Sequence, residues 1–123
     1  MRTNPTMPMA YRAEAIAYCV EPHPGMFHLG DSYALRPDAV QQWAADRAAH
    51  IAASLGAHHA GTACQFLAWA RHVTADHTGE LLQAGHSVTY THTDSDCLWQ
   101  LALRPVPEHH PRSLAPLRNG ASS

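Results

Sequence analysis

Two pairs of cysteine and histidine residues have the types and spacing of metal ligands. Three residues separate Cys19 from His23, and four separate His92 from Cys97. Both spacings lie within the range of tetrahedral Cys2His2 zinc sites, where thiolate and imidazole suit the metal. The four residues can form one site only if the strand that contains Cys19 neighbours the hairpin around His92 and Cys97. The alternative is that both cysteines are small core residues and both histidines lie in loops.

Further histidines surround two predicted helices, and one of them has a carboxylate at helical spacing. His72 and Asp76 are four residues apart, which suits an imidazole that is oriented by a carboxylate and acts as a general base. Cys64 lies two helical turns from His72, too far for direct activation of its thiol. The alternative for the dyad is a weak pair on a solvated face, and we interpret His58 and His59 as part of a polar loop between helices. The histidines of this group are His50, His58, His59, His72 and His77.

The tetrapeptide Leu29-Gly30-Asp31-Ser32 resembles the first sequence block of the GDS-type serine esterases, in which a serine just after a strand is the nucleophile. That family also has a D-x-x-H motif that supplies the acid and the base. No aspartate of this chain is followed by histidine at the third position, and a serine without its base is not activated. We therefore interpret Gly30 and Asp31 as hairpin turn residues and Ser32 as the start of the next strand.

Other motifs for catalysis or nucleotide binding are absent from the sequence. It contains no G-x-G-x-x-G, G-x-x-x-x-G-K-[ST], H-E-x-x-H or G-x-S-x-G, so no cofactor is predicted. The formal net charge is -2, and the arginines are spread along the chain without the clustering with aromatic residues that a single-strand groove requires. Nucleic acid is therefore disfavoured as a partner, unless the fold brings the arginines to one face.

Composition bears on compartment and origin. Three cysteines without a C-x-x-C leave at least one unpaired within the chain, which favours a reducing compartment. No apolar run approaches the roughly 18 residues of a membrane span, and residues 1–10 lack the apolar segment of a secretory signal. We therefore predict a cytoplasmic protein. The alanine-rich, histidine-rich and lysine-free composition suggests a GC-rich genome, hence the hypothesis of a bacterial or phage origin.

The pattern of Pro, Gly and apolar residues divides the 123-residue chain into one domain and two tails. Residues 1–9 and the Pro-rich residues 105–123 read as mobile tails, and residues 10–104 as a single globular domain. Within the domain, residues 13–20 alternate as a first strand, and residues 26–29 and 32–35 flank a turn as a short hairpin.

Two helices are predicted in the middle of the domain. Pro37 suits a first helical turn, and Val40, Ala44, Ala48, Ile51 and Leu55 keep helical spacing up to Gly56. The second helix begins with Thr62 as N-cap and is interrupted at Thr78-Gly79, with one further turn before Gly85. Its predicted buried stripe is Phe66, Leu67, Ala70 and Val73, with Trp69 at the edge.

A second hairpin is predicted from residues 86–93 and 97–104. Its pairing places His92 opposite Cys97, Tyr90 opposite Trp99 and Val88 opposite Leu101. The inner face is then Val88, Tyr90, Cys97, Trp99, Leu101 and Leu103. The outer face is Ser87, Thr89, Thr91, Thr93, Leu98, Gln100 and Ala102.

The order strand-strand-helix-helix-strand-strand predicts an α+β fold, with an antiparallel sheet of about four strands and two helices on one face. Trp99 is expected in the core. Trp43 and Trp69 are expected at the core boundary, and they become candidate interface anchors if they prove exposed. Without a complete catalytic motif, the sequence predicts a protein that binds another protein or itself and has no catalysis of its own. The alternative is a metal-supported protein, either a zinc module on Cys19, His23, His92 and Cys97 or a small hydrolase that uses the helical histidines.

Overall fold

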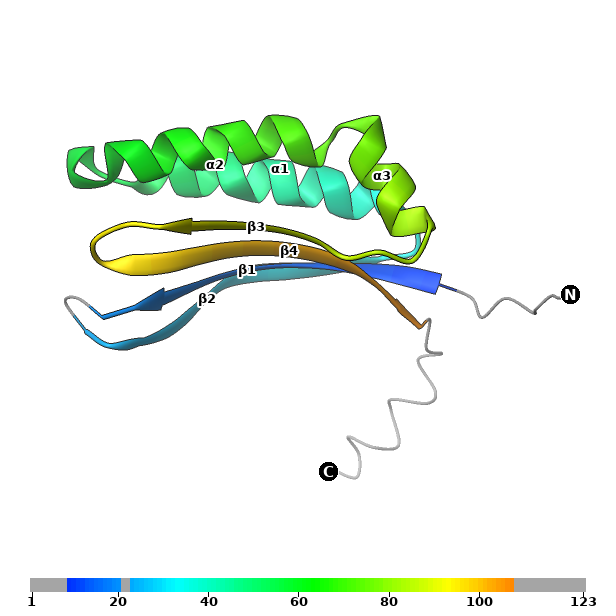
Figure 1. Ribbon diagram of the computed structural model, residues 1–123, viewed down its shortest axis with the longest axis horizontal. Coiled ribbons are helices and arrows are strands. Elements are labelled where there is room, and N and C mark those ends of the chain that lie inside the picture. Colours follow the sequence, from blue (N-terminus) through cyan, green and yellow to red (C-terminus); the bar gives the residue numbers. More distant parts are fainter. Residues whose placement is uncertain (1–8, 21–22, 108–123) are drawn as a thin grey trace, which may run out of the picture.

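The protein has two layers, an antiparallel four-stranded sheet and a layer of helices on one of its faces (Figure 1). The computed structural model describes residues 9–20 and 23–107, and the sheet has the order β2-β1-β4-β3. This confirms the predicted α+β class and the order of its elements. The elements are β1 (Met9–Cys19), β2 (Gly25–Ala34), α1 (Pro37–Ser54), the 3-10 turn η1 (Ala57–His59), α2 (Ala60–Val73), α3 (Asp76–Gln83), β3 (Val88–Thr93) and β4 (Cys97–Pro107).

The small residues of β1 face the helices. Ala13, Ala15 and Ala17 are buried, whereas their neighbours Ile16 and Tyr18 lie on the other face and are partly or largely exposed. Helix α1 presents further buried alanines to the core. Small side chains on both layers let the helix lie close to the sheet. The larger apolar residues of this strand therefore remain on the face that no helix covers.

The first predicted hairpin is wrong. Gly25–Ala34 forms one continuous strand, and its hairpin partner is β1. Gly30 and Asp31 lie inside β2 beside a register shift between Ala15 and Ile16, and not in a turn. Gly30 has a φ of 127° there, so the sequence signal that suggested a turn belongs to a β-bulge.

The first helix is confirmed, and the second differs from its prediction. Helix α2 ends at Val73, and α3 begins at Asp76, so the interruption lies at residues 74–75 and Thr78-Gly79 lies within α3. The N-cap of α2 is His59, while Thr62 is buried in the first turn. Two residues of the predicted stripe exchange roles: Leu67, predicted to be buried, is largely exposed, and Trp69, predicted at the edge, is buried.

The second hairpin has the predicted faces and a different register. The inner residues of β3 and β4 are the more buried ones, as expected. His92, however, lies opposite Trp99, and Tyr90 lies opposite Leu101, two residues from the predicted pairing. The cause is that Asp94 closes the turn by a backbone hydrogen bond of 2.9 Å to the carbonyl oxygen of Cys97.

The burial of the tryptophans and the bounds of the sheet differ in detail from the prediction. Trp69 and Trp99 are buried, and Trp43 is partly buried against the core. Strand β1 begins at Met9 and β4 continues to Pro107, so the sheet extends slightly beyond residues 10–104. The rest of both predicted tails lies outside the described residues. Among the described residues, no helix is long and apolar enough to cross a membrane.

Candidate functional site

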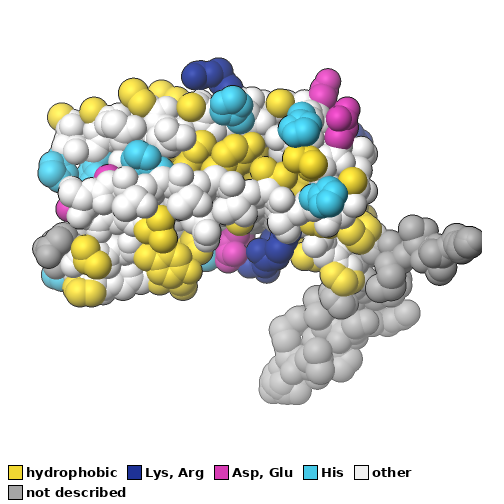
Figure 2. Space-filling model, in the orientation of Figure 1, with side chains coloured by type: hydrophobic (Ala, Val, Ile, Leu, Met, Phe, Trp, Pro, Cys, Tyr) yellow, Lys and Arg dark blue, Asp and Glu magenta, His cyan; other side chains and the backbone are white. Residues whose placement is uncertain are grey.

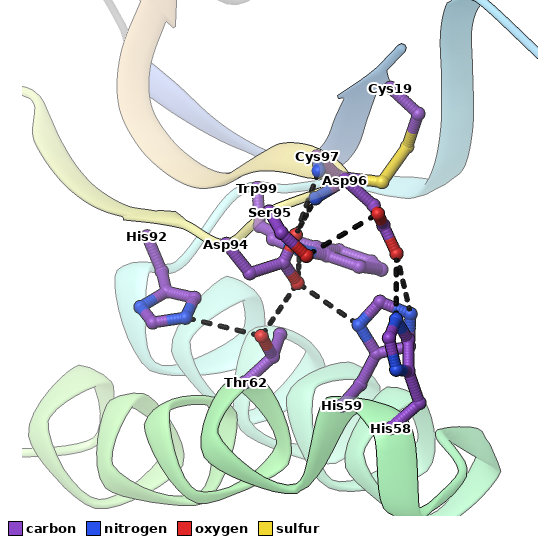
Figure 3. Close-up of polar contacts among 10 residues, drawn as sticks. All are labelled: Cys19, His58, His59, Thr62, His92, Asp94, Ser95, Asp96, Cys97 and Trp99. Atoms are coloured by element: carbon purple, nitrogen blue, oxygen red, sulfur yellow. Dashed lines mark hydrogen bonds and ion pairs between the residues drawn. A yellow bond between two sulfur atoms is a disulfide. The ribbon is translucent and has the colours of Figure 1, made fainter. Parts of the chain in front are cut away.

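Asp94, in the turn between β3 and β4, organises a polar cluster against the start of α2 (Figure 3). Its Oδ2 accepts hydrogen bonds from Thr62 Oγ1 at 2.7 Å and Trp99 Nε1 at 2.9 Å, and lies 3.1 Å from His59 Nδ1. Its Oδ1 accepts the backbone N–H groups of Asp96 and Cys97. One carboxylate thus fixes the turn and joins it to the helix layer.

These hydrogen bonds keep Asp94 ionised. Burial by itself would raise the pKa of Asp94, but the hydrogen bonds from Thr62, Trp99 and the two backbone N–H groups hold that pKa well below its usual range. An ionised carboxylate can only accept hydrogen bonds, so His59 must donate the proton on Nδ1. The orientation of the His59 ring follows from Asp94.

A second carboxylate, Asp96, faces the two histidines of η1. Its Oδ2 lies 3.1 Å from His58 Nε2 and 3.6 Å from His59 Nε2. One ligand atom from each of the three residues lies within 4.8 Å of the others. His58 is 73% exposed at its side chain, whereas His59 and Asp96 are each 22% exposed. The cluster therefore opens to solvent on the His58 side.

The predicted Cys2His2 ligands do not form a site together. Cys19 and Cys97 are paired residues of β1 and β4, and a disulfide joins them, so neither thiolate is available to a metal. His23 is exposed in the segment before β2. His92 Nε2 lies 3.1 Å from Thr62 Oγ1. The condition stated for that site, that the Cys19 strand neighbours the last hairpin, is met, and the predicted unpaired cysteine is Cys64.

The other two predicted sites are also rearranged. His72 and Asp76 belong to different helices, because α2 ends between them, and the structure shows no hydrogen bond or ion pair between these two described residues. Ser32 lies within β2 opposite Ala13, and not after a strand. The resemblance to the serine esterases therefore does not extend to the position of the serine.

The face of the sheet away from the helices forms a second candidate surface, which we call the open face. Large apolar side chains lie at its end near the β1–β2 connection, where Tyr18, Val20 and Leu98 line a hollow of about 320 Å³ beside the β3–β4 turn. Figure 2, in the orientation of Figure 1, shows apolar side chains along the lower side of the molecule, with acidic and basic groups between them. The large apolar residues of the open face are Ile16, Tyr18, Val20, Met26, Tyr33 and Leu98.

Charged groups in the middle of the open face neutralise each other. Arg12 lies 2.6 Å from Asp31 and 3.6 Å from Glu14, and Arg104 lies 3.7 Å from Glu14. Arg12 and Arg104 are opposite each other in β1 and β4, so the fold does bring two arginines together. Because each has a carboxylate partner, they do not form the basic patch that nucleic acid requires.

The sequence interpretation missed the cluster around Asp94 and Asp96. His58 and His59 read as loop residues, and both aspartates read as turn residues. The signal that could have found them is the pair of adjacent histidines before one helix together with the D-x-D of a hairpin turn. Only the packing of η1 over that turn makes the two segments neighbours. No family model, curated protein or solved structure matches this chain.

Proposed function

We propose that this protein acts by protein–protein interaction through the open face, without catalysis of its own, and that the occupant of this face is a second copy of the chain. The observation that carries the proposal is the exposure of large apolar residues there. Tyr18 is 43%, Tyr33 50% and Met26 57% exposed. Tyrosine, methionine and arginine are enriched in protein interfaces. Tyr18 and Met26 lie opposite each other at one end of the open face and Tyr33 lies beside Arg12 at the other, so apolar anchors flank the charged centre as in an interface with polar groups.

The dimensions of the open face suit a dimer. Four strands spaced about 4.8 Å apart and about 30 Å long present roughly 600 Å² per copy. Two copies face to face then bury about 1,200 Å², the lower end of specific interfaces. The open face is large enough for self-association and too small for an extensive obligate assembly.

Its charges favour a copy of the same surface. In its centre, Arg12 lies opposite Arg104 and Glu14 lies opposite Asp31, so two like-charged rows of opposite sign stand side by side. A two-fold axis that runs between the two rows places the arginines of one copy against the carboxylates of the other. A strongly charged partner would gain little electrostatic attraction from this face, because its positive and negative charges balance. Self-complementarity therefore supports a homodimer over a highly acidic or basic partner.

Sedimentation velocity over a range of protein concentrations tests the proposal. The wild-type protein is expected to dimerise, and Met26→Glu and Tyr18→Glu are expected to be monomeric, because each places an unpaired charge in the interface. Leu67→Glu is the matched control, since Leu67 is 44% exposed on α2, away from the open face. A wild-type monomer at all concentrations would overturn the proposal, as would dimers that persist in both open-face variants.

The proposal includes the predicted cytoplasmic location and bacterial or phage origin. The Cys19–Cys97 disulfide counts against this location, because cytosolic reductants keep most thiols reduced and the two cysteines would there be unbonded neighbours. Alkylation of thiols in intact cells, followed by mass spectrometry, tests the location. Three alkylated cysteines support it, whereas alkylation of Cys64 alone indicates an oxidising compartment and contradicts it.

A further inference from the structure

In the cluster of His58, His59 and Asp96, a 3.1 Å hydrogen bond between His58 Nε2 and Asp96 Oδ2 places a proton on His58 Nε2, and a metal would replace that proton once it moves to Nδ1 of the same ring. The Nε2 atom of His59 faces the same carboxylate oxygen as a second acceptor. Asp94 accepts the Nδ1 proton of His59, so in the neutral imidazole the Nε2 atom carries a lone pair. That lone pair lies 3.6 Å from Oδ2 of Asp96, which is also an acceptor when ionised. Two acceptors that face each other leave a position for a cation.

Two of the three distances between ligand atoms of the cluster are close to those around a small divalent metal. Ligands 2.0–2.1 Å from a tetrahedral zinc ion lie about 3.4 Å from each other. Asp96 Oδ2 lies 3.1 Å from His58 Nε2 and 3.6 Å from His59 Nε2, on either side of that value. The third distance joins the two imidazole nitrogens, which lie within 4.8 Å of each other. Because the His58 side chain is exposed, its ring can turn to bring its nitrogen to the distance that the metal requires.

We propose that His58 Nε2, His59 Nε2 and Asp96 Oδ2 bind one zinc ion, with water as the fourth ligand on the solvent side. Two imidazoles and a carboxylate are ligands that zinc accepts, and three protein ligands with one open position are typical of non-structural zinc sites. This ligand set is different from the cysteine-containing set that the sequence predicts, and it is independent of the open face.

Asp94 has the part of a positioning residue in this site. A histidine that ligates a metal usually donates its other ring N–H to a carboxylate or carbonyl, which fixes the ring and increases the basicity of the ligand nitrogen. The 3.1 Å contact between His59 Nδ1 and Asp94 Oδ2 has this geometry. Asp94 is itself held by Thr62 and Trp99, so the His59 ligand is oriented before metal binds.

The competing explanation is a cluster of ion pairs in which protonated histidines face Asp96. Protonated imidazoles have no lone pair for a metal, so the two explanations differ in measurable zinc affinity at a pH above the titration of histidine. Isothermal titration calorimetry of the untagged, full-length protein with zinc chloride at such a pH separates them. One zinc per chain is expected, and cobalt in its place is expected to give the visible absorption of a tetrahedral site.

Three variants identify the ligands. His58→Ala and Asp96→Asn are each expected to weaken zinc binding by at least about tenfold. His50→Ala is the matched control, because His50 is an exposed histidine on α1, outside the cluster, and its affinity is expected to equal that of the wild type. Absence of stoichiometric zinc binding by the wild type would overturn the proposal. Equal affinity in all three variants would do the same, since it would assign binding to other histidines.

Discussion

At the scale of single residues, Asp94 determines the local structure more than any other side chain of the cluster. It accepts hydrogen bonds from a helix, from a buried indole and from two backbone groups of its own turn. Hydrogen bonds to a charged group stabilise a fold by about 1.5–3 kcal/mol, and donors that lose their partner in a part-buried site add a desolvation cost. Asp94 therefore links the stability of the β3–β4 turn to pH.

We expect Asp94→Asn to lower the free energy of unfolding by about 2–3 kcal/mol at neutral pH, because the amide turns a donor toward groups that also donate. In the wild type, the folded-state pKa of Asp94 is below its unfolded value of about 3.9. Its contribution is thus present above about pH 4 and is lost as the pH falls further. Urea unfolding at neutral and at acidic pH measures both effects.

The matched control for this prediction is Asp46→Asn. Asp46 is exposed on α1 and accepts one hydrogen bond, from Gln42. Its substitution should change stability by less than about 0.5 kcal/mol, without the loss of the acid-dependent step. If Asp94→Asn and the wild type lose stability in parallel below pH 4, the proposed role of the Asp94 charge is wrong.

At the scale of elements, Gly30 shows why β2 is one strand. An added Cβ would lie 3.2 Å from both Arg47 Nε and Trp43 Cζ2, side chains of α1. The residue also has a φ of 127°, which L side chains rarely adopt. Glycine thus lets the helix approach the bulge of the edge strand closely.

We expect Gly30→Ala to destabilise the fold by about 1–3 kcal/mol, from backbone strain and from displacement of the Trp43 ring. Gly61→Ala provides a control of opposite sign. Gly61 lies in α2 with no atom within 4 Å of its Cβ position, so alanine should stabilise the helix by about 0.5–1 kcal/mol. Guanidinium unfolding of both variants gives the comparison, and similar changes for the two would contradict this account of Gly30.

The elements differ in how far the sequence predicts them. The spacing of Val40, Ala44 and Ala48 specifies α1, because a regular helix repeats one local geometry. Alternation in β3 and β4 specifies their faces for the same reason. The register of paired strands and the positions of bulges depend on contacts between residues that are distant in the sequence. The turn that Asp94 and Cys97 close and the bulge at Gly30 could therefore not be predicted from the local pattern. The pairing of η1 with that turn could not be read either, and the candidate site depends on it.

At the scale of the whole molecule, the disulfide joins the first strand to the last. Cys19 and Cys97 are 78 residues apart, and the three α-helices, η1, β2 and β3 lie between them. In the chain-entropy model, such a bond lowers the conformational entropy of the unfolded chain and thereby raises the free energy of unfolding by about 4 kcal/mol. The folded sheet already places the two residues opposite each other, with a Cα–Cα distance of 4.0 Å. The bond therefore acts mainly on the unfolded state.

We expect the double substitution Cys19→Ser with Cys97→Ser to lower the free energy of unfolding by about 2–4 kcal/mol, with the sheet retained. Wild-type protein treated with reductant should unfold at the same denaturant concentration as this variant. Cys64→Ser is the control, because that cysteine is exposed and unpaired, and it should leave stability unchanged. If reduction leaves the wild-type transition where it was, the bond does not constrain the unfolded chain. An equal loss of stability in Cys64→Ser would show that the effect does not come from the Cys19–Cys97 bond.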